Sequence, residues 1–451
     1  MLQSNRMRRG AVAMLVALAL LGASCSRDPE EVGSEEDETT QPDGSSDSRL
    51  DEGLFGDLGR VCEDGDASGA TDVGVTDDTI QIGTITDKGF TSRPGLNQEM
   101  YDAAVAFAGW CNSLGGINGR EVVVEDRDAA MLSFNTEIVE ACEADFALVG
   151  GGAVLDDSDN GGREACGLPN FPGYVVSAGA RAGGLQVQAL PNPVGNINIG
   201  PYRIIADTDP EVIDRMGIIT ASFGSVIDVR DDTVAAATEL GYEVVYSGDY
   251  DSLGESNWRP FAEAIRDADV QVFDFVGEPT YLGQLLLALD EIDYHPRYIV
   301  LNANFYDTLF LETSGAIAEN TFVRLQFTPL ELADENAATA DYLALMEEFN
   351  PDGKVALLGM QAMSSMLLWA QSAAACGNEL TRECLLDEAG SVTEWTGGGL
   401  HASQNPAESR PGNCFLSMEM TPDGFVVSDE LTDANDGIFN CDDANIAALS
   451  E

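Results

Sequence analysis

Basic residues are scarce in this chain. Only 22 of its 451 residues are lysine or arginine, against 78 aspartates and glutamates, which gives a formal net charge of −56. Lysine occurs only as Lys88 and Lys354. Because a surface of this charge repels nucleic acid, we exclude nucleic acid as a partner and expect a strongly hydrated exterior.

Long apolar runs are also missing, and none after residue 24 reaches the roughly 20 residues that a membrane-spanning helix needs. Near the start, arginines precede an apolar run at residues 11–21, which is too short to span a bilayer but has the charge order of a secretory signal. Small residues then lead to Cys25. The segment resembles a bacterial lipoprotein signal, although Gly22 stands where leucine is usual. We expect removal of residues 1–24 and lipidation of Cys25, with a plain secretory signal as the alternative.

Zinc-binding patterns are absent, since the chain has no Cys-x-x-Cys pair and only two histidines, His295 and His401. We therefore expect no metal site. Setting Cys25 aside leaves eight cysteines, an even number that suits disulfides in an oxidising compartment. The sequence does not determine how they pair. Their order along the chain favours pairing between neighbours: Cys62–Cys111, Cys142–Cys166, Cys376–Cys384 and Cys414–Cys441.

Motifs of catalysis and of nucleotide binding are missing as well. The "VGGG" at 149–152 belongs to neither glycine-rich phosphate-binding pattern, and a tight turn after a buried strand explains it better. Two acidic stretches, 156–162 and 433–437, lack the spaced ligands and final glutamate of a calcium loop, so we interpret them as solvated turns. His401 and Ser403 have no nucleophile motif around them. We therefore predict neither an enzyme nor a cofactor.

Large apolar side chains are rare between residue 26 and about residue 61, where Glu, Asp, Ser and Gly dominate. Such a segment buries too little surface to fold. We predict that residues 25–61 form a disordered acidic tether that starts at the lipidated cysteine and reaches roughly 30–35 Å. It would hold a globular body close to the outer face of a membrane.

Strand-like and helix-like segments alternate from about residue 77. "TIQIGTI" (79–85) has the β-branched composition of a strand, and an apolar stripe of period 3.6 follows over residues 100–114. Further strands are predicted at 121–125, 146–150 and 174–178. This alternation is typical of an α/β fold with a parallel sheet between helices.

The same alternation restarts near residue 216. Strands are predicted at 216–220, 243–247, 270–277, 297–302 and 321–327, with helices between them, and two helices follow at about 335–349 and 356–375. Two units of this size predict a two-lobed body. In such sheets, ligands bind beyond the carboxyl ends of the strands, so we expect the functional residues just after strands.

The chain resembles the type I periplasmic solute-binding proteins, in particular the branched-chain amino-acid-binding group of ABC transporters, in the order and spacing of several short sequence segments. The resemblance covers about residues 75–430 and is carried by "GVTDDTIQIGTITD" (74–87), "LGGINGREVVVEDRDA" (114–129), "YVVSAGA" (174–180), "MGIIT" (216–220), "YLGQLLLAL" (281–289) and "LLGMQAMSSMLLWAQSA" (357–373). It implies two Rossmann-like lobes joined by a three-stranded hinge and closing on a small solute.

The resemblance also implies boundaries. Three crossings between the lobes are expected near 196–201, 325–330 and 403–412. The first lobe would then be 77–198 plus 328–405, the second 199–326 plus 411–430, and the remainder a C-terminal tail, 431–451, that Cys441 fastens to Cys414.

Amino-acid-binding members of the family hold the ligand carboxylate with hydroxyl and backbone donors of the first lobe, and the ammonium with an acidic group of the second. Here the corresponding loops depart from that pattern. Ala153, Val154 and Leu155 stand in place of a serine cluster, Arg181, which follows Ala180, falls near the position of a threonine, and "LNANF" (301–305) lacks the expected glutamate. These departures argue against an α-amino acid as ligand.

Other side chains offer compensating chemistry. We expect Arg181 to pair with a ligand carboxylate, because guanidinium is a bidentate donor, and Glu278 to hold a cation or amide. Phe223, Asn302 and Asn304 follow predicted strands of the second lobe and would line the opposite wall. An ordinary surface ion pair for Arg181 and a helix-opening role for Glu278 are the alternatives.

The predicted function is an extracytoplasmic, membrane-anchored lipoprotein, expected to be a monomer. It would capture a small polar organic solute, such as an amino acid or amide, and deliver it to an ABC permease. The alternative is a receptor subunit of a signalling system that uses the same fold to sense its ligand.

Overall fold

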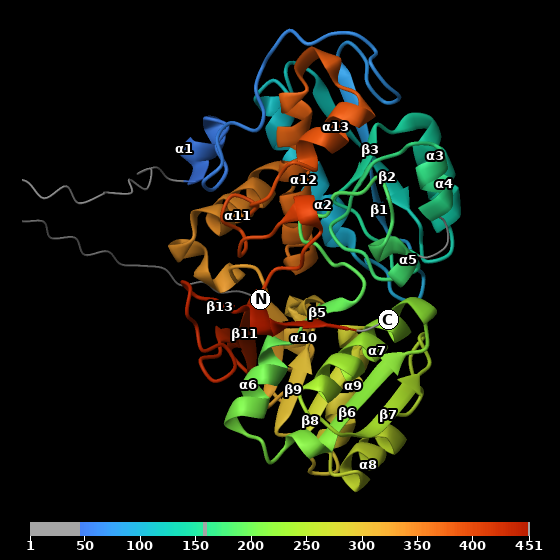
Figure 1. Ribbon diagram of the computed structural model, residues 1–451, viewed down its shortest axis with the longest axis vertical. Coiled ribbons are helices and arrows are strands. Elements are labelled where there is room, and N and C mark those ends of the chain that lie inside the picture. The colour runs from blue at the N-terminus through green and yellow to red at the C-terminus, as the bar shows by residue number, and fades with distance from the viewer. Residues whose placement is uncertain (1–45, 157–159, 450–451) are drawn as a thin grey trace, which may run out of the picture. The chain divides into compact units, whose positions relative to one another are not determined.

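The structure is a computed structural model and describes residues 46–156 and 160–449. The predicted signal peptide, Cys25 and the first part of the predicted tether lie outside these residues. Two separate sheets carry helices on their faces (Figure 1). We call the sheet of the N-terminal strands and the helices packed on it the first lobe, and the other sheet with its helices the second lobe.

The first lobe is built on a parallel four-stranded sheet in the order β2-β1-β3-β4. Its central strand β1 is the predicted "TIQIGTI" segment, and its residues from Ile82 to Thr86 are all buried, as expected for a strand covered on both faces. The strands are β1 (Thr79–Thr86), β2 (Glu121–Asp128), β3 (Ala147–Val149) and β4 (Asn170–Phe171).

Helices cover both faces of this sheet (Figure 1). Helix α12 (Leu357–Ala375) is buried on most of its surface and packs along α2 (Gln98–Ser113), with α11 (Ala337–Phe349) and α13 (Arg382–Ala389) beside them. On the other face, α3 (Phe134–Ala144) closes a separate small core around Ile85 and Leu148. The predicted helix 356–375 is therefore the central helix of the lobe, consistent with its apolar sequence.

The second lobe is built on a larger sheet in the order β12-β11-β10-β9-β8-β6-β7. Five of these strands run parallel: β6 (Met216–Ala221), β7 (Val244–Tyr250), β8 (Val272–Val276), β9 (Tyr298–Leu301) and β10 (Thr321–Leu325). The antiparallel hairpin of β11 (Cys414–Thr421) and β12 (Gly424–Val427) completes one edge. The sequence prediction placed residues 411–430 in this lobe but did not foresee the hairpin.

Two helical layers enclose the second sheet. Helices α6 (Gly200–Thr208) and α7 (Gly224–Glu239) share one core through Ile205, Ala236 and Ala237. The opposite layer contains α8 (Arg259–Asp267), α9 (Pro279–Asp290) and α10 (Thr308–Ser314), whose apolar side chains pack on Phe273 and Phe275 of β8. The loops that follow β6, β8 and β9 face the first lobe.

The chain passes between the two lobes three times: after β4, after β10 and before β11. The first passage contains the short strand β5 (Asn196–Asn198), which pairs with β14 (Ile446–Ala448) of the C-terminal tail. The tail also pairs through β13 (Asn440–Cys441) with β11. The tail is therefore part of the connection between the lobes, a role that the sequence did not predict.

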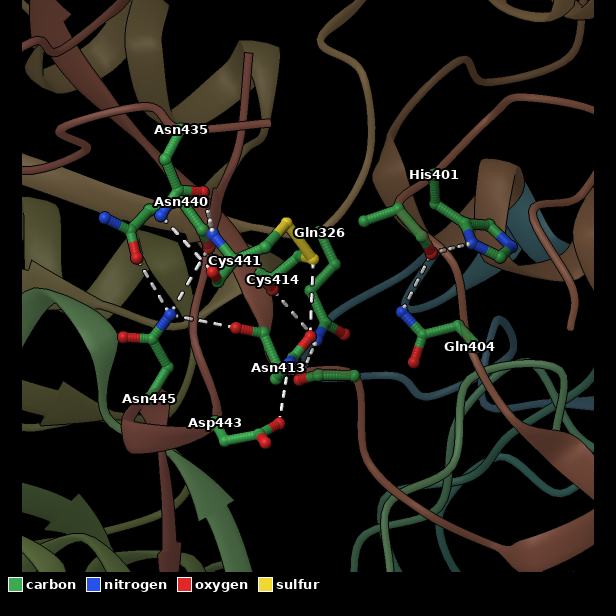
Figure 2. The surroundings of a disulfide bond; sticks show 12 residues. Gln326, His401, Gln404, Asn413, Cys414, Asn435, Asn440, Cys441, Asp443 and Asn445 are labelled. Carbon is green, nitrogen blue, oxygen red and sulfur yellow. Dashed lines mark hydrogen bonds between the residues drawn. A yellow bond between two sulfur atoms is a disulfide. The ribbon is translucent and has the colours of Figure 1, made fainter. Parts of the chain in front are cut away.

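An asparagine-rich network fastens this tail around the Cys414–Cys441 disulfide (Figure 2). Asn445 is fully buried, and its side-chain amide donates to the carbonyl of Asn413 at 2.9 Å and to Oδ1 of Asn440 at 2.9 Å. The side chain of Asn435 likewise donates to the carbonyl of Cys441 at 3.2 Å. Because these amides have partners within the protein, the tail is bound by directed contacts rather than by apolar burial alone.

The structure corrects the predicted tether, because residues 46–61 are folded on the first lobe. Helix α1 (Ser46–Asp51) places Leu50 in the core, and Phe55 is fully buried. Arg49 forms an ion pair with the buried Asp341 at 3.2 Å, and Asp341 also accepts the backbone N–H of Gly56 at 2.8 Å. A few apolar anchors and one buried ion pair thus order a stretch whose composition alone predicted disorder.

A second correction concerns the predicted strand at 174–178. The fourth strand of the first sheet is β4, which lies earlier, and Ser177 instead caps the short helix α5 (Ala178–Arg181). The backbone N–H groups of Val176 and Ser177 donate to the buried carboxylate of Asp156 at 2.7 and 2.9 Å. The side chain therefore takes the place of a neighbouring strand as hydrogen-bond acceptor.

The four disulfides have the predicted partners: Cys62–Cys111, Cys142–Cys166, Cys376–Cys384 and Cys414–Cys441. The second of these lies beside α4 (Asn160–Ala165). Within residues 46–156 and 160–449, no helix combines the length and apolar composition needed to cross a membrane.

Candidate ligand-binding site

A cavity of about 380 Å³ lies between the two lobes and is lined by both of them and by the passages that connect them. This volume suits a small organic molecule. First-lobe residues come from the loops after β1 and β3 and from α12, and second-lobe residues from the loops after β6, β8 and β9. The cavity therefore lies at the carboxyl ends of parallel strands, where the sequence predicted the functional residues.

The walls of the cavity are mostly apolar. Six aromatic side chains line it: Phe90, Tyr174, Phe223, Tyr250, Tyr281 and Phe327. Aliphatic side chains from both lobes fill the spaces between them, among them Leu96, Val154, Val226, Val276 and Leu358. Such a surface favours a ligand with a substantial apolar part.

The loop after β3 reaches the second lobe directly. The backbone N–H of Val154 donates to the buried carboxylate of Asp87 at 2.7 Å, and Met131 donates to its other oxygen at 2.7 Å. Burial raises the pKa of Asp87, while these backbone donors work in the opposite direction. Because the carbonyl of Val154 accepts the hydroxyl of Ser225 at 2.8 Å, Asp87 positions a loop that contacts the opposite lobe.

Arg181 lines the cavity, and each of its three guanidinium nitrogens already has a partner. Nε donates to the carbonyl of Asn192 at 3.2 Å, Nη2 to that of Pro193 at 2.9 Å, and Nη1 to Asp232 of α7 at 2.8 Å. The side chain is 4% exposed. In this structure Arg181 thus joins the first lobe, the first passage and the second lobe, and its donors are engaged with the protein.

Glu278 also lines the cavity, at the N-terminus of α9, and forms an ion pair with Arg93 of the first lobe at 3.3 Å. Burial raises the pKa of Glu278, and the positive charge of Arg93 opposes that effect. The pair crosses from one lobe to the other. Glu278 therefore has a counter-charge in the protein itself, in addition to its place at a helix terminus.

A third contact between the lobes involves one of the two lysines. The ammonium of Lys354, which precedes α12, lies 3.0 Å from Asp307 of the second lobe and 3.3 Å from Glu99 of the first. Burial works against its charge, but the two carboxylates raise the pKa of Lys354 overall. Three of the contacts between the lobes are therefore ion pairs, formed by Arg181, Arg93 and Lys354.

Asn302 and Asn304 follow β9 and both line the cavity. Asn304 donates to the carbonyl of Gly277 at 3.0 Å, which ties together the loops after β8 and β9. Asn302 accepts a hydrogen bond from Nη2 of Arg324 at 3.1 Å. Arg324 is the main residue that the sequence prediction missed, and its signal was the single charged residue in the predicted strand "TFVRLQF" (321–327).

Most of the predicted site residues lie at this cavity. It is lined by Val154, Arg181, Phe223, Glu278, Asn302 and Asn304. Leu155 and Ala180 do not line it. Ala180 is buried within α5, where its N–H donates to the hydroxyl of Ser177. Leu155 directly follows Val154, which does line the cavity. Whether any of these residues contacts a ligand stays a prediction.

No group of three or more His, Cys, Asp or Glu side chains gathers as a potential metal site in the part of the chain that the structure describes. The cavity offers hydrogen-bonding amides, charged pairs and apolar surface. These groups are suited to binding an organic molecule.

Residues 209–424 match a family model described as periplasmic binding protein. No curated protein matches the sequence. The fold is similar to that of a fatty acid ABC transporter substrate-binding protein from Thermomonospora curvata, with 16% identity and a TM-score of 0.65 over 82% of this chain and 97% of that chain.

Two further solved structures are similar. One is the branched-chain amino acid transporter substrate-binding protein from Streptococcus pneumoniae in complex with isoleucine, with 13% identity and a TM-score of 0.61 over 78% of this chain and 100% of that chain. The other is an ABC transporter solute-binding protein from R. palustris in complex with 4-hydroxybenzoate, with 13% identity and a TM-score of 0.61 over 78% of this chain and 96% of that chain. At these identities the likeness shows the fold.

Proposed function

We propose that this chain is the extracytoplasmic substrate-binding subunit of an ABC importer, a proposal supported by the match of residues 209–424 to the periplasmic binding protein family and by the similarity of its fold to such subunits. The observation that carries the proposal is the cavity of about 380 Å³ between the lobes, lined by loops from the carboxyl ends of both sheets. It captures a small organic solute there and delivers it to a permease. The protein itself performs no chemical step.

The arrangement of the cavity supports a mechanism of capture by closure. Both lobes contribute walls, so a bound solute contacts both only when they are together, and its binding energy favours that state. The ion pairs of Arg93 with Glu278 and of Arg181 with Asp232 join the lobes in the same state. The bound solute and the ion pairs therefore both stabilise the state in which the two lobes are together.

We further propose that the mature protein is held at the outer face of the membrane by a lipid on Cys25. The supporting observation is the apolar run at residues 11–21 that ends in small residues and this cysteine. Mass spectrometry of the mature N-terminus should find a diacylated Cys25, and Cys25→Ser should release the protein from the membrane fraction. A mature N-terminus at another residue would contradict the anchor.

Isothermal titration against a broad panel of solutes, with closure followed by small-angle scattering, tests the importer proposal. The variant Ala303→Trp places a large side chain in the cavity and should abolish binding, because Ala303 lines it. The matched control Ala235→Trp, at an exposed position of α7, should bind as the unchanged protein does. Silence across amino acids, amides, amines and carboxylates would count against the proposal.

A further inference from the structure

The charged side chains that line the cavity do not balance. Three arginines and two carboxylates line it, which leaves an excess of one positive charge, in a protein whose net charge is −56. Two of the arginines are paired: Arg93 with Glu278 and Arg181 with Asp232. The unbalanced charge is therefore that of Arg324.

The guanidinium of Arg324 has a single hydrogen bond within the described residues, from Nη2 to Oδ1 of Asn302 at 3.1 Å. It forms no ion pair there with an acidic side chain. Burial lowers the pKa of Arg324, because the surrounding protein solvates the guanidinium less well than water does. A guanidinium carries five N–H donors in a planar fork, so most of its hydrogen-bonding capacity is unused.

One acidic group does influence Arg324 from behind the cavity. Asp274 of β8 does not line the cavity, and its carboxylate accepts the hydroxyl of the buried Tyr202. Burial raises the pKa of Asp274 to about 6, against the opposing influence of Tyr202 and of Arg324. The negative charge of Asp274 therefore partly offsets the positive charge of Arg324, while the N–H donors of Arg324 stay available to a ligand.

We propose that the cavity selects monocarboxylates with an apolar body, and that the carboxylate of the solute pairs with Arg324 while its body packs among the aromatic walls. This inference rests on the proposed function and names its substrate class. A planar carboxylate accepts two parallel N–H bonds from a guanidinium, which is the strongest contact that this side chain makes. The apolar side chains that line the cavity then contact the rest of the ligand.

The charged side chains that line the cavity also disfavour amines and α-amino acids as ligands. A ligand ammonium requires a carboxylate or several oxygen acceptors once it leaves water. The two carboxylates that line the cavity, Asp232 and Glu278, are each paired with an arginine, at 2.8 and 3.3 Å. An ammonium would have to break one of these pairs, whereas a simple carboxylate breaks none. The departures from the amino-acid-binding pattern seen in the sequence point the same way.

The test compares matched ligands on the unchanged protein by isothermal titration. The probes are benzoate, phenylacetate and hexanoate, each with its primary amide, together with leucine and isoleucine. The amides preserve size and shape but remove the negative charge. We expect the carboxylates to bind at least ~10-fold more tightly than their amides, as hydrogen bonds to a charged group imply. This comparison needs no variant and is independent of any effect of mutation on folding.

Variants then assign the effect to one residue. Arg324→Met should lower carboxylate affinity ~10- to 100-fold and leave amide affinity nearly unchanged, while Arg324→Lys should retain part of the carboxylate affinity. The matched control is Arg259→Met, which removes an exposed arginine paired with Glu263 on α8 and should bind as the unchanged protein does. Thermal unfolding of each variant verifies that it is folded.

The outcomes separate this inference from the proposed function. If amides or the two amino acids bind as tightly as the carboxylates, or if Arg324→Met loses no carboxylate affinity, the carboxylate assignment is wrong while the solute-binding function stands. If none of the probes binds and a broader panel is equally silent, the proposed function itself fails, and the inference with it.

Discussion

Arg93 of the first lobe and Glu278 of the second form an ion pair, with 3.3 Å between Nε and Oε2, beside the cavity that both residues line. Their side chains are about 21% and 28% exposed, so water screens part of the attraction. Partly exposed pairs are worth up to about 1 kcal/mol. Because the pair joins the two lobes, under the proposed function its energy contributes to closure and so to the apparent affinity for solute.

Neutralising this pair should weaken solute binding modestly. We expect Arg93→Gln and Glu278→Gln each to raise the Kd by about 2- to 5-fold, and the double variant to be no worse than either single variant, because one interaction is lost in all three. Isothermal titration of the four proteins with one solute measures the coupling. Fully additive losses would show that the two side chains act separately, for example on the ligand.

Asp274 should contribute less to the stability of the fold at neutral than at acid pH. Burial raises the pKa of its carboxyl to about 6 in the folded protein, from 3.8, so the folded state favours the protonated form. The stability that this group contributes is therefore full below about pH 4 and lost as the pH rises through about 6, on the order of 3 kcal/mol in all. Asp274→Asn should remove this dependence.

The measurement is the free energy of unfolding of Asp274→Asn minus that of the unchanged protein, at pH 4 and at pH 8. We expect the difference to move in favour of the variant at pH 8. The exposed Asp293→Asn serves as the control and should give the same difference at both values. A difference for Asp274→Asn that does not change with pH would contradict the prediction.

His401 should act in the opposite direction. Its ring is buried between the hydroxyl of Ser364, 2.8 Å from Nε2, and the carbonyl of Ala402, 2.9 Å from Nδ1. Burial lowers the pKa of His401 from 6.5 to about 4. The neutral ring therefore stabilises the fold above pH 6.5, and this contribution, about 3 kcal/mol, is lost as the pH falls towards 4.

His401→Gln should flatten that acid dependence, whereas the exposed His295→Gln should leave it as it is. Urea unfolding at a series of pH values between 4 and 7 gives the comparison. The variant will be less stable at pH 7, because it fits the site less well, so only the slope with pH is diagnostic. A slope equal to that of the unchanged protein would refute the role assigned to the buried ring.

The disulfide of the tail should matter beyond its contribution to global stability. Replacing Cys414 and Cys441, which are 27 residues apart, by serine should cost roughly 3–4 kcal/mol on the loop-entropy model. Because Cys441 lies in β13 and β14 follows it along the tail, amide exchange should also rise at Ile446–Ala448 and in the paired strand β5.

The matched control replaces Cys376 and Cys384 by serine. These two lie 8 residues apart and distant in sequence from the tail, so the expected cost is about 2.5 kcal/mol. Amide exchange at β5 and β14 should stay slow in this variant. Equal exchange in both variants would show that the tail is held without its disulfide.

The alternation of strands and helices was predictable because burial on both faces makes parallel strands continuous apolar runs, as in Met216–Ala221, where all six residues are buried. The strand predicted at 174–178 was wrong because a single buried carboxylate, Asp156, supplied acceptors for its backbone. Hydrogen bonds of this kind join distant residues and leave no periodic pattern in the sequence.

The residues of the candidate site were likewise only partly predictable from the sequence. Residues just after strands, such as Phe223 and Asn304, were predictable from topology, because parallel strands deliver their carboxyl ends to one edge. Arg324 lies inside the last residues of β10, and its exposure to the cavity depends on where the chain leaves the sheet. The pairing of Arg181 with Asp232 was equally hidden, since the two residues lie on different lobes.

The folded N-terminal segment has a mechanical consequence. The ion pair of Arg49 with Asp341 and the Cys62–Cys111 disulfide both attach that segment to the first lobe, the latter covalently. Whatever restrains the N-terminus therefore restrains the first lobe. Under the proposed function, a permease would meet a first lobe of fixed position and a second lobe whose position depends on whether solute is bound.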